Sequence, residues 1–472
     1  MMTSRKPPEE IKLAGHISPE EKLEADYRMI PFDVPDGICR LDVEYAFSRD
    51  EPGGILKEAG NIIDIGLFDS RGSEFLTARG FRGWSGSARR ALFIGTNDAS
   101  PGYIPGPMPS GRWHIILGMH RVLPEGCDFK VTVKMQPGVP ESDISTELTE
   151  GSIVGGGPAW YRGDLHCHTH HSDAQGSLGD LVAMGRAQGL DFIAVTEHNT
   201  VSHLAQFGKF GGEHPLLIPG EEITTDHGHA NVWGIQRWQE FRCRTSAQMA
   251  QVADQAKEQG CLISINHPKE SGPPWTFGDE SRYDCIEVWQ LAWFMFNNQS
   301  LALWDRLLCE GHRITAVGGS DYHQEPFTGE IGVLALGTPC TWVYAEELSE
   351  RAILEGIKIG RVFISESPTG PRIFLEAVAE DQEAKIGDVL TVASREDVQF
   401  QCRVEGATGC DLWICSHGDV KEWAIEGDEW TCDWTTQVVG NTYFRAEVRQ
   451  QSQQGDAVMH AMSNPIYVQV ES

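Results

Sequence analysis

The sequence predicts an α/β fold whose central unit lies between two β-sandwiches. Three observations support this prediction. From residue 160 to about 366, short apolar runs alternate with helical stretches, whereas 26–137 and 367–472 contain only strand-like runs with glycine or proline breaks. Strands and helices that alternate at this spacing are typical of parallel strands with crossover helices, in either a barrel or an open sheet.

The N-terminal region divides into an arm and a predicted β-sandwich. Residues 1–25 are charged and contain proline, and we expect them to form an arm at the surface. Region 26–137 is predicted to be a sandwich from its strand-like runs, which are 37–47, 60–69, 88–95, 112–122 and 128–135. The Pro/Gly-rich loop 99–111 is either an ordinary surface loop, the more frequent case, or a segment that approaches a neighbouring active site.

A linker, the central unit and a second sandwich follow. Residues 138–159 are polar and then glycine-rich, as expected of a linker. The expected strands of the central unit, 160–366, are 191–198, 214–224, 229–235, 261–268, 284–290 and 313–321. Its expected helices are 177–189, 245–260, 299–311 and 346–360. Region 367–472 is predicted to be a second β-sandwich from the runs 371–378, 398–406, 411–418, 442–450 and 464–470.

Composition excludes several classes of partner. The chain has 472 residues, of which 68 are acidic and 38 basic, and its formal charge of −30 disfavours nucleic acid and anionic membrane surfaces. No run of 18 apolar residues predicts a membrane span, and the N-terminus lacks the apolar stretch of a secretory signal. The twelve cysteines form no C-x-x-C pair, which favours reduced thiols in a cytoplasmic protein.

Histidines and carboxylates gather at the predicted strand ends. Twelve of the 17 histidines lie between His166 and His323. The carboxyl ends of parallel strands carry the active sites of barrels and open α/β sheets. Six polar clusters occupy such positions, namely Asp164–His168 with Asp173, Glu197–Asn199, Glu221–Glu222, His227–Asn231, Asn266–Pro268 and Ser320–His323.

These clusters have the chemistry of a metal site. Residues i and i+2 of a strand share a face, so His166 and His168 can bind one ion, and Asp321 and His323 repeat the arrangement. Mixed imidazole and carboxylate ligands suit Zn²⁺, Mn²⁺ or Fe²⁺. Because eight or nine ligands exceed the needs of one ion, we expect two or three divalent metal ions that share bridging carboxylates.

The order of these motifs resembles a known superfamily. An H-x-H with a following Asp, T-E-H-N, G-E-E-I, H-P and G-S-D-Y-H are similar to the motifs of the polymerase and histidinol phosphatase (PHP) superfamily across residues 160–366. The segments YRGDLHCHT, AVTEHNTVSH, PGEEITTDHGHANVWGI and NPIYV resemble the subgroup that includes bacterial carbaryl (aryl methylcarbamate) hydrolases.

The resemblance implies a distorted (β/α)7 barrel and a ligand set. It implies a first metal held by His166, His168, Glu222 and Asp321. Glu222 would bridge to a second metal, which His267 and His229 complete, with His227 as the competitor of His229. A third metal would be held by Asp173, His198 and His323. Two departures adjoin ligand positions, because Glu197 stands where many members have Asp and Ala174 where Gly often follows.

The expected mechanism is attack by a metal-activated water on an ester. Glu197 is a candidate for moving protons, and its alternative role is to orient a ligand histidine. Lys269, together with Arg162 and Arg282, could bind phosphate oxygens, although an ordinary surface charge is the more frequent case for each. Trp293, within the aromatic segment 289–296, could contact an apolar leaving group or pack on a flanking domain. Tyr322 is a further candidate for substrate contact.

Three functions therefore stand as hypotheses. The first is a metal-dependent phosphoesterase acting on a small molecule, the commonest activity that the resemblance implies. The second is a carbamate or carboxylic ester hydrolase with an aromatic substrate, and the third is a non-catalytic metal-binding module. Substrate, metal identity and oligomeric state, with a homo-oligomer among the options, are left open by the sequence.

Overall fold

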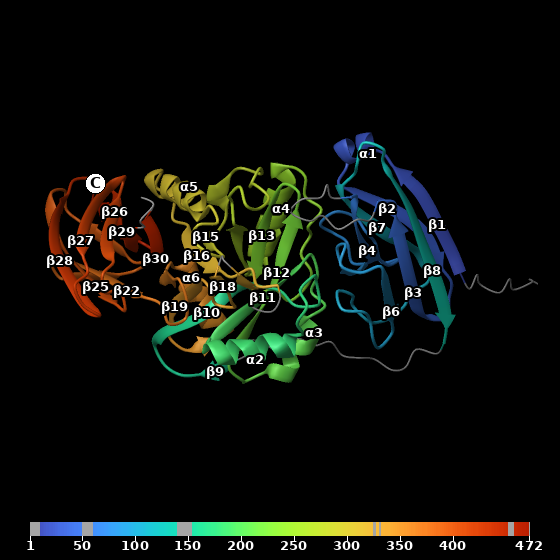
Figure 1. Ribbon diagram of the computed structural model, residues 1–472, viewed down its shortest axis with the longest axis horizontal. Helices are drawn as coiled ribbons and strands as arrows, with labels where there is room; N and C mark the ends of the chain where they lie inside the picture. Colours follow the sequence, from blue (N-terminus) through green and yellow to red (C-terminus); the bar gives the residue numbers. More distant parts are fainter. Residues whose placement is uncertain are drawn as a thin grey trace, which may run out of the picture.

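The computed structural model describes residues 10–49, 60–138, 153–323, 327–329, 332–451 and 457–471. Three parts follow one another along the long axis of the molecule, with the N-terminal strands at one end and the C-terminal strands at the other (Figure 1). The central part combines strands and helices, so the fold is mixed α/β with strands predominating. No described helix has both the length and the apolar character needed to cross a membrane.

The N-terminal part is built from two antiparallel sheets packed face to face. Their strand orders are β1-β8-β3-β6 and β2-β7-β4-β5. Burial alternates along the strands, so apolar side chains such as Val131 and Val133 fill the space between the sheets. The strands are β1 Glu10–Ile17, β2 Tyr27–Val34, β3 Ile38–Phe47, β4 Ile62–Phe68, β5 Phe81–Trp84, β6 Ala91–Gly95, β7 Gly111–Arg121 and β8 Cys127–Pro137.

The segment expected to be an N-terminal arm is instead part of this sandwich. Strand β1 pairs with β8 from Glu10 opposite Lys134 to Ile17 opposite Cys127. Helix α1, Pro19–Glu24, follows, and the side chain of Ser18 caps it. The charged residues of β1 alternate with apolar ones, which suits an edge strand, and this period-2 pattern outweighs the polar composition. Residues 1–9 lie outside the described residues.

A long sheet runs through the central part. Its strand order is β16-β15-β14-β13-β12-β11-β10-β19-β21. Two small two-stranded sheets, β9 with β20 and β17 with β18, lie outside this order. The strands of the central part are β9 Ile153–Gly155, β10 Ala159–Cys167, β11 Phe192–His198, β12 Leu216–Thr225, β13 Gly228–Trp233, β14 Leu262–Asn266, β15 Cys285–Gln290, β16 Thr315–Gly319, β17 Phe327–Gly329, β18 Gly332–Leu334, β19 Cys340–Ala345, β20 Leu348–Ser349 and β21 Val362–Ser365. Of the expected linker 138–159, the part 139–152 lies outside the described residues, and β9 and the start of β10 fall within the rest.

The expectation of parallel strands holds only in part of this sheet. Strands β10, β11 and β12 are parallel neighbours, as are β14, β15 and β16, but β13 runs antiparallel to both β12 and β14. The reason is a tight turn: Thr225 pairs with Gly228, which leaves only Asp226 and His227 to connect the strands. A connection of two residues reverses the chain and cannot make a parallel crossover.

Closure into the seven-stranded barrel is not seen. Strand β10 continues the sheet into β19, to which it is antiparallel, and no ladder joins β10 to β16 among the described residues. The ends of these two strands meet through one isolated bridge between Cys167 and Tyr322, where the His168 amide donates to the Tyr322 carbonyl over 2.9 Å. The C-terminal ends of the strands therefore still converge on one region.

Helices cover the central sheet and begin at polar caps. Ser177 and Asp180 form a capping box on the helix after β10, and Thr245 and Gln248 form another on the helix after β13. Gly189 ends the first of these with a φ of 69°, which favours glycine. The helices are α2 Leu178–Gln188, α3 Leu204–Phe207, α4 Ser246–Glu258, α5 Asn297–Cys309 and α6 Glu350–Lys358, with short 3-10 turns at Gly208–Phe210 and Glu280–Arg282.

The C-terminal part shares a sheet with the central part. Strand β21 pairs with β30, and the sheet continues through β29 and β26 to β27, while a second sheet has the order β23-β22-β25-β28. Apolar residues of both sheets form one core. The strands are β22 Arg372–Ala379, β23 Gln382–Lys385, β24 Val389–Val392, β25 Glu396–Glu405, β26 Asp411–Ser416, β27 Asp419–Ala424, β28 Glu429–Val438, β29 Thr442–Gln451, β30 Ala457–Ser463 and β31 Ile466–Val470.

Arg445→Met is expected to loosen the attachment of this C-terminal part. The buried guanidinium of Arg445 binds Glu447 and lies 2.9 Å from Asp305 on α5. Burial alone would raise the pKa of Glu447, but Arg445 and Arg449 hold that pKa below its usual value. Breaking such a buried pair costs about 3–5 kcal/mol. Denaturant unfolding at pH 7.5 should show this deficit.

The loss of stability in Arg445→Met is expected to be smaller at low pH than at neutral pH. Because the folded-state pKa of Glu447 is lowered in the wild type, its contribution is complete above the unfolded value of 4.5 and is lost as pH falls through the folded value. In Arg445→Met, Glu447 keeps only Arg449 as a cationic partner, and its protonation removes a buried charge that is then less well compensated, so the deficit should shrink at low pH. A deficit that is independent of pH would contradict the role given to this ion pair.

Candidate metal centre

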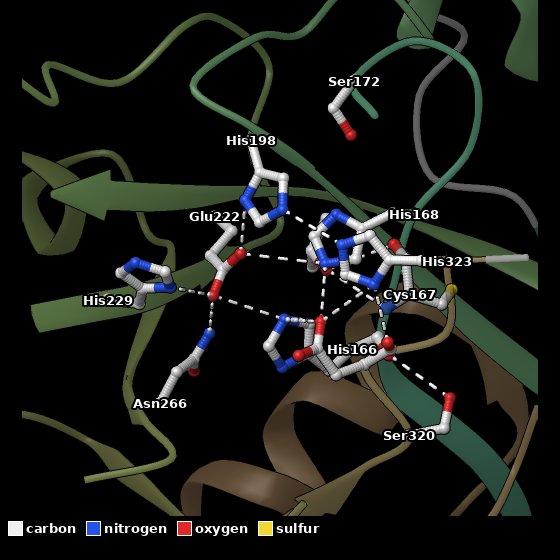
Figure 2. A network of polar contacts seen from close by, with 12 residues as sticks. His166, Cys167, His168, Ser172, His198, Glu222, His229, Asn266, Ser320 and His323 are labelled. Carbon is white, nitrogen blue, oxygen red and sulfur yellow. Dashed lines mark hydrogen bonds and ion pairs between the residues drawn. The ribbon is translucent and has the colours of Figure 1, made fainter. Parts of the chain in front are cut away.

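All nine predicted metal ligands come together in one cluster. They lie at or just after the C-terminal ends of strands β10, β11, β12, β14 and β16, and on β13 beside the tight turn. Figure 2 shows Glu222 in the middle of this cluster, with imidazole rings around it. The nine residues are His166, His168, Asp173, His198, Glu222, His229, His267, Asp321 and His323.

Glu222 is the shared carboxylate of the cluster. It is fully buried, and burial alone would raise its pKa, but the surrounding histidines hold that pKa well below its usual value. Its two oxygens face ring nitrogens of His198 at 2.7 Å, His229 at 3.2 Å, His166 at 3.3 Å and His267 at 3.4 Å, while the Asn266 amide donates to it over 3.0 Å. One carboxylate therefore contacts several imidazole rings at once.

The donors fall into overlapping groups whose ligand atoms lie within 4.8 Å of one another. Glu222 belongs to two of them, one with His166 and His168 and one with His229 and His267. Asp321 adjoins the first of these groups, with one oxygen 3.3 Å from His166 and 3.1 Å from His168. A further group contains His168, Asp173, His198 and His323. The overlap at Glu222 is the arrangement of a bridging carboxylate.

His229, and not its competitor, faces this cluster. The Nε2 atom of His227 lies 3.1 Å from the carboxylate of Asp26 in the N-terminal sandwich. His227 belongs to the turn before β13, whereas His229 lies within β13 with Nδ1 3.2 Å from Glu222.

The residues fit divalent metal ions on chemical grounds. Nε2 of His166 is buried and lies 3.3 Å from both Glu222 and Asp321, yet it has no hydrogen-bond partner of good geometry among the described residues. Buried polar atoms are rarely left unpaired. Burial, with the charges of His198 and His323, lowers the pKa of His168 to about 3, so its ring is neutral, the form that binds metals. The imidazole and carboxylate donors suit borderline ions.

Glu287 is a functional candidate that the sequence analysis missed. One of its oxygens lies 2.9 Å from Nδ1 of His166, and the other accepts the His267 amide over 3.0 Å. Together with these two histidines it also forms a group of possible ligands. The available signal was a lone carboxylate within the buried strand β15, because a charge in such a place needs partners.

Asp164 supports the opposite side of the centre. It is fully buried and accepts hydrogen bonds from the amides of His166, Ser320 and Gly337 at 3.1, 3.0 and 2.7 Å. Burial raises its pKa, and these hydrogen bonds oppose that effect. Its carboxylate therefore holds the end of β10 against the loop that carries Asp321.

Glu197 does not face the cluster. It precedes His198 on β11, and neighbouring residues of a strand point to opposite sides. Its carboxylate is fully buried and accepts from the Thr169 amide over 3.0 Å and from the hydroxyls of Thr169 and Ser172. Burial, opposed by these bonds, raises its pKa to about 7. The placement favours anchoring of the loop before Asp173 over either proton transfer or the orientation of a ligand histidine.

Glu197→Gln should therefore retain turnover to within about threefold. Glutamine keeps an oxygen acceptor for Thr169 and offers an amide to Ser172, whereas loss of a general acid or base costs about 10²–10⁴-fold. Glu197→Ala removes the anchor and should lower the melting temperature, which makes it the structural control. A hundredfold loss of kcat in the glutamine variant, at unchanged metal content, would establish a catalytic role instead.

The predicted substrate contacts are engaged elsewhere. Lys269 is buried, and its Nζ donates to the Gln290 carbonyl over 3.0 Å and to Asn297 over 2.7 Å. Burial lowers its pKa to about 8. Trp293 packs edge-on against Trp289 with the ring centroids 5.1 Å apart, and Tyr322 packs on a core cluster near α2. Lys269 thus ties two loops together, and none of the three lines the cavity at the cluster.

A cavity of about 600 Å³ lies between the cluster and the N-terminal sandwich. Asp173, His198 and His229 line one side of it. The sandwich contributes the opposite wall, which includes Tyr27, Ile62, Asp64, Trp84, Gly118, Met119 and His120. The sequence analysis assigned no site residue to this region.

The Pro/Gly loop 99–111 contacts the central part next to the site. The amide of Gly102 donates to the Ser202 hydroxyl over 3.0 Å, and its carbonyl accepts from the Thr200 hydroxyl over 2.8 Å. Both partners lie just beyond His198 and Asn199, so the less frequent of the two expectations for this loop describes its position.

One comparison with known proteins supports the family resemblance for part of the chain. Residues 164–262 match the family model of the PHP domain, which supports the PHP superfamily for this part of the chain. No curated protein matches the chain. A solved structure from Bacteroides vulgatus ATCC 8482, described as a two-domain protein containing a predicted PHP-like metal-dependent phosphoesterase, is similar with 18% identity and a TM-score of 0.37, covering 68% of this chain and 100% of its own. At those values the similarity carries no argument.

Proposed function

We propose that the chain is a divalent-metal-dependent hydrolase that acts on a small phosphoester. The observation that carries the proposal is Glu222, which belongs to two donor groups beside an open cavity. The PHP domain match over 164–262 supports the same class. The charge of −30 favours a small molecule over a nucleic acid as substrate.

The chain offers places for two or three ions. His166, His168, Glu222 and Asp321 would hold the first, and Glu222, His229 and His267 the second. Asp173, His198 and His323 would hold a third. When bound, such ions supply a water activated at neutral pH and polarise the substrate oxygen.

The surrounding residues position these donors. Glu287 beside Nδ1 of His166 leaves Nε2 of that ring facing Glu222 and Asp321. A carboxylate behind a ligand histidine fixes its tautomer and ring orientation. Asn266 likewise fixes Glu222 from the end of β14. The N-terminal sandwich forms the opposite wall of the cavity.

A carbamate or carboxylic ester hydrolase is the second candidate. The cavity is lined by the aromatic residues Tyr27 and Trp84, and no lysine or arginine is among its described lining residues. A phosphate site usually offers such cations, although metal ions can replace them. The non-catalytic alternative is less favoured, because it gives no reason for a cavity to open onto the donors.

A substrate comparison tests the proposal. The full chain is loaded with Mn²⁺ or Zn²⁺, its metal content is measured, and p-nitrophenyl phosphate, p-nitrophenyl acetate and 1-naphthyl methylcarbamate are assayed. We expect preferred hydrolysis of the phosphate, lost in His166→Ala. Preference for the acetate or carbamate would select the second candidate, and metal binding without hydrolysis of any substrate would select the non-catalytic one.

A further inference from the structure

The wall of the cavity opposite the metal ligands comes from the N-terminal sandwich and has its own chemistry. Strand β4 buries Ile63 and Ile65 between the two sheets and turns Ile62 and Asp64 outward, toward the central part. Asp64 lines the cavity in the company of Tyr27 and Trp84. This strand therefore places a carboxylate on the far side of the cavity from Glu222.

Asp64 differs from the other carboxylates that line the cavity. Asp226 is bound by Lys22 and His120, and Asp26 lies 2.6 Å from Lys22. Asp173 lies 3.3 Å from His323. For Asp64, by contrast, no hydrogen bond or ion pair joins its carboxylate to another described residue.

Glycines keep the space around Asp64 open. A Cβ atom on Gly86 would meet Oδ1 of Asp64 at 3.8 Å and the indole nitrogen of Trp84 at 3.9 Å. A Cβ atom on Gly118 would come within 2.7 Å of the Trp84 ring and 3.1 Å of the Asp64 Cβ. Asp64 and the Trp84 indole thus both lie beside Gly86 and Gly118, and neither glycine has a side chain that would occupy the space next to them.

We propose that Asp64 is a specificity-determining residue that binds an ammonium group on the substrate. This inference rests on the proposed hydrolase and narrows its substrate to small esters with an amine at the end remote from the reacting group. A carboxylate without another partner is suited to an ammonium ion through a charge-assisted hydrogen bond.

The charges around the cavity agree with this assignment. Bound divalent ions would make the cavity wall near Glu222 positive. The opposite wall, which contains Asp64, is negative, and no unpaired cationic side chain is among the described residues that line it. Burial, together with the neighbouring Asp226 and Asp173 and against His120 and His198, raises the pKa of Asp64 to about 6. An unpaired carboxylate in such surroundings is unfavourable when charged, and a bound cation would relieve it. A second anionic group on the substrate would be repelled.

A charge series of non-hydrolysable ligands tests the inference as binding rather than turnover. The metal-loaded full chain is titrated calorimetrically with benzylphosphonate, 4-(aminomethyl)benzylphosphonate and 4-carboxybenzylphosphonate. We expect the aminomethyl ligand to bind at least about tenfold more tightly than benzylphosphonate, and the carboxy ligand to bind more weakly. In Asp64→Asn the aminomethyl preference should disappear while the Kd of benzylphosphonate is unchanged.

Asp33→Asn is the matched control, since Asp33 lies in the same sandwich but is exposed and pairs with Arg112. It should keep the full preference, and both variants should keep the wild-type metal content. Equal binding of the three ligands by the wild type, or uniform weakening in Asp64→Asn, overturns the inference and leaves the hydrolase standing. If phosphates are not hydrolysed but the preference is present, only the proposed reaction fails. If no phosphonate binds, both fail.

Discussion

Glu222→Gln is expected to lower hydrolysis by more than about a thousandfold and to remove at least one metal ion per chain. The variant keeps the size of the side chain and the acceptor for Asn266, but it loses the charge that four histidines surround. A neutral amide is a poor bridging ligand, and the activation of water depends on the bound ions. Metal content by mass spectrometry and kcat on the preferred substrate measure the two effects.

The adjacent residue provides a matched control for this variant. Glu221 is equally buried on β12 but points to the other side, where it accepts the Gln239 amide over 2.8 Å. Burial raises its pKa well above the usual value, and glutamine keeps an oxygen acceptor for the Gln239 amide, so this substitution should have little effect. Comparable losses in Glu221→Gln and Glu222→Gln would show that the strand, and not a bridging ligand, is what the substitution damages.

Asp164→Ala is expected to reduce both stability and metal binding. The substitution leaves three buried amides, those of His166, Ser320 and Gly337, without their acceptor. An unsatisfied buried group costs about 1–3 kcal/mol, so we expect a loss of at least about 3 kcal/mol in denaturant unfolding. Because Ser320 precedes Asp321, the release of this loop should also weaken the first metal site.

Asp180→Ala separates this effect from the loss of any carboxylate. Asp180 is an exposed member of the capping box of α2, and its removal should destabilise the chain only slightly, without affecting metal content. If Asp164→Ala were no less stable than Asp180→Ala, the buried carboxylate would not be the organiser that we describe.

The gathering of the nine candidate metal ligands was predictable because their signals are local. His166 and His168 are two residues apart at the end of a strand, and Asp321 and His323 repeat this spacing. The alternation of strands and helices then brings such ends together, even though β13 reverses direction and the barrel does not close. Convergence of the strand ends is thus enough to bring the donors together.

Other parts of the site have only weak local signals or none. Glu287 is a single carboxylate in a strand, and Asp164 stands beside a motif without a role that its spacing would reveal. Asp64 and Trp84 belong to a region whose pattern predicts only a sandwich. Their place beside the cavity depends on docking between distant segments, where Lys22 and His120 bind Asp226 in the turn between β12 and β13. Such contacts are set by the tertiary fold.

The docking of the sandwich also explains why the predicted substrate residues do not line the cavity. Lys269 and Trp293 belong to segments near the ligand motifs, which is why the sequence predicts them as substrate contacts. Their side chains instead pack within the central part. The cavity opens instead toward the N-terminal sandwich, whose outward-facing residues on β4 form its far wall. The aromatic segment 289–296 has exposed members, Phe294 and Phe296, but none of its residues lines this cavity.

The most direct test of a Glu222-centred, multinuclear hydrolase is a metal titration of the metal-free chain. Bound metal per chain and hydrolysis of the preferred ester are measured together as Mn²⁺ or Zn²⁺ is added. The account predicts at least two ions per wild-type chain, with activity that develops as the second ion binds and is absent in Glu222→Gln. Hydrolysis by the metal-free chain in the presence of a chelator, or full activity with one ion, would contradict it.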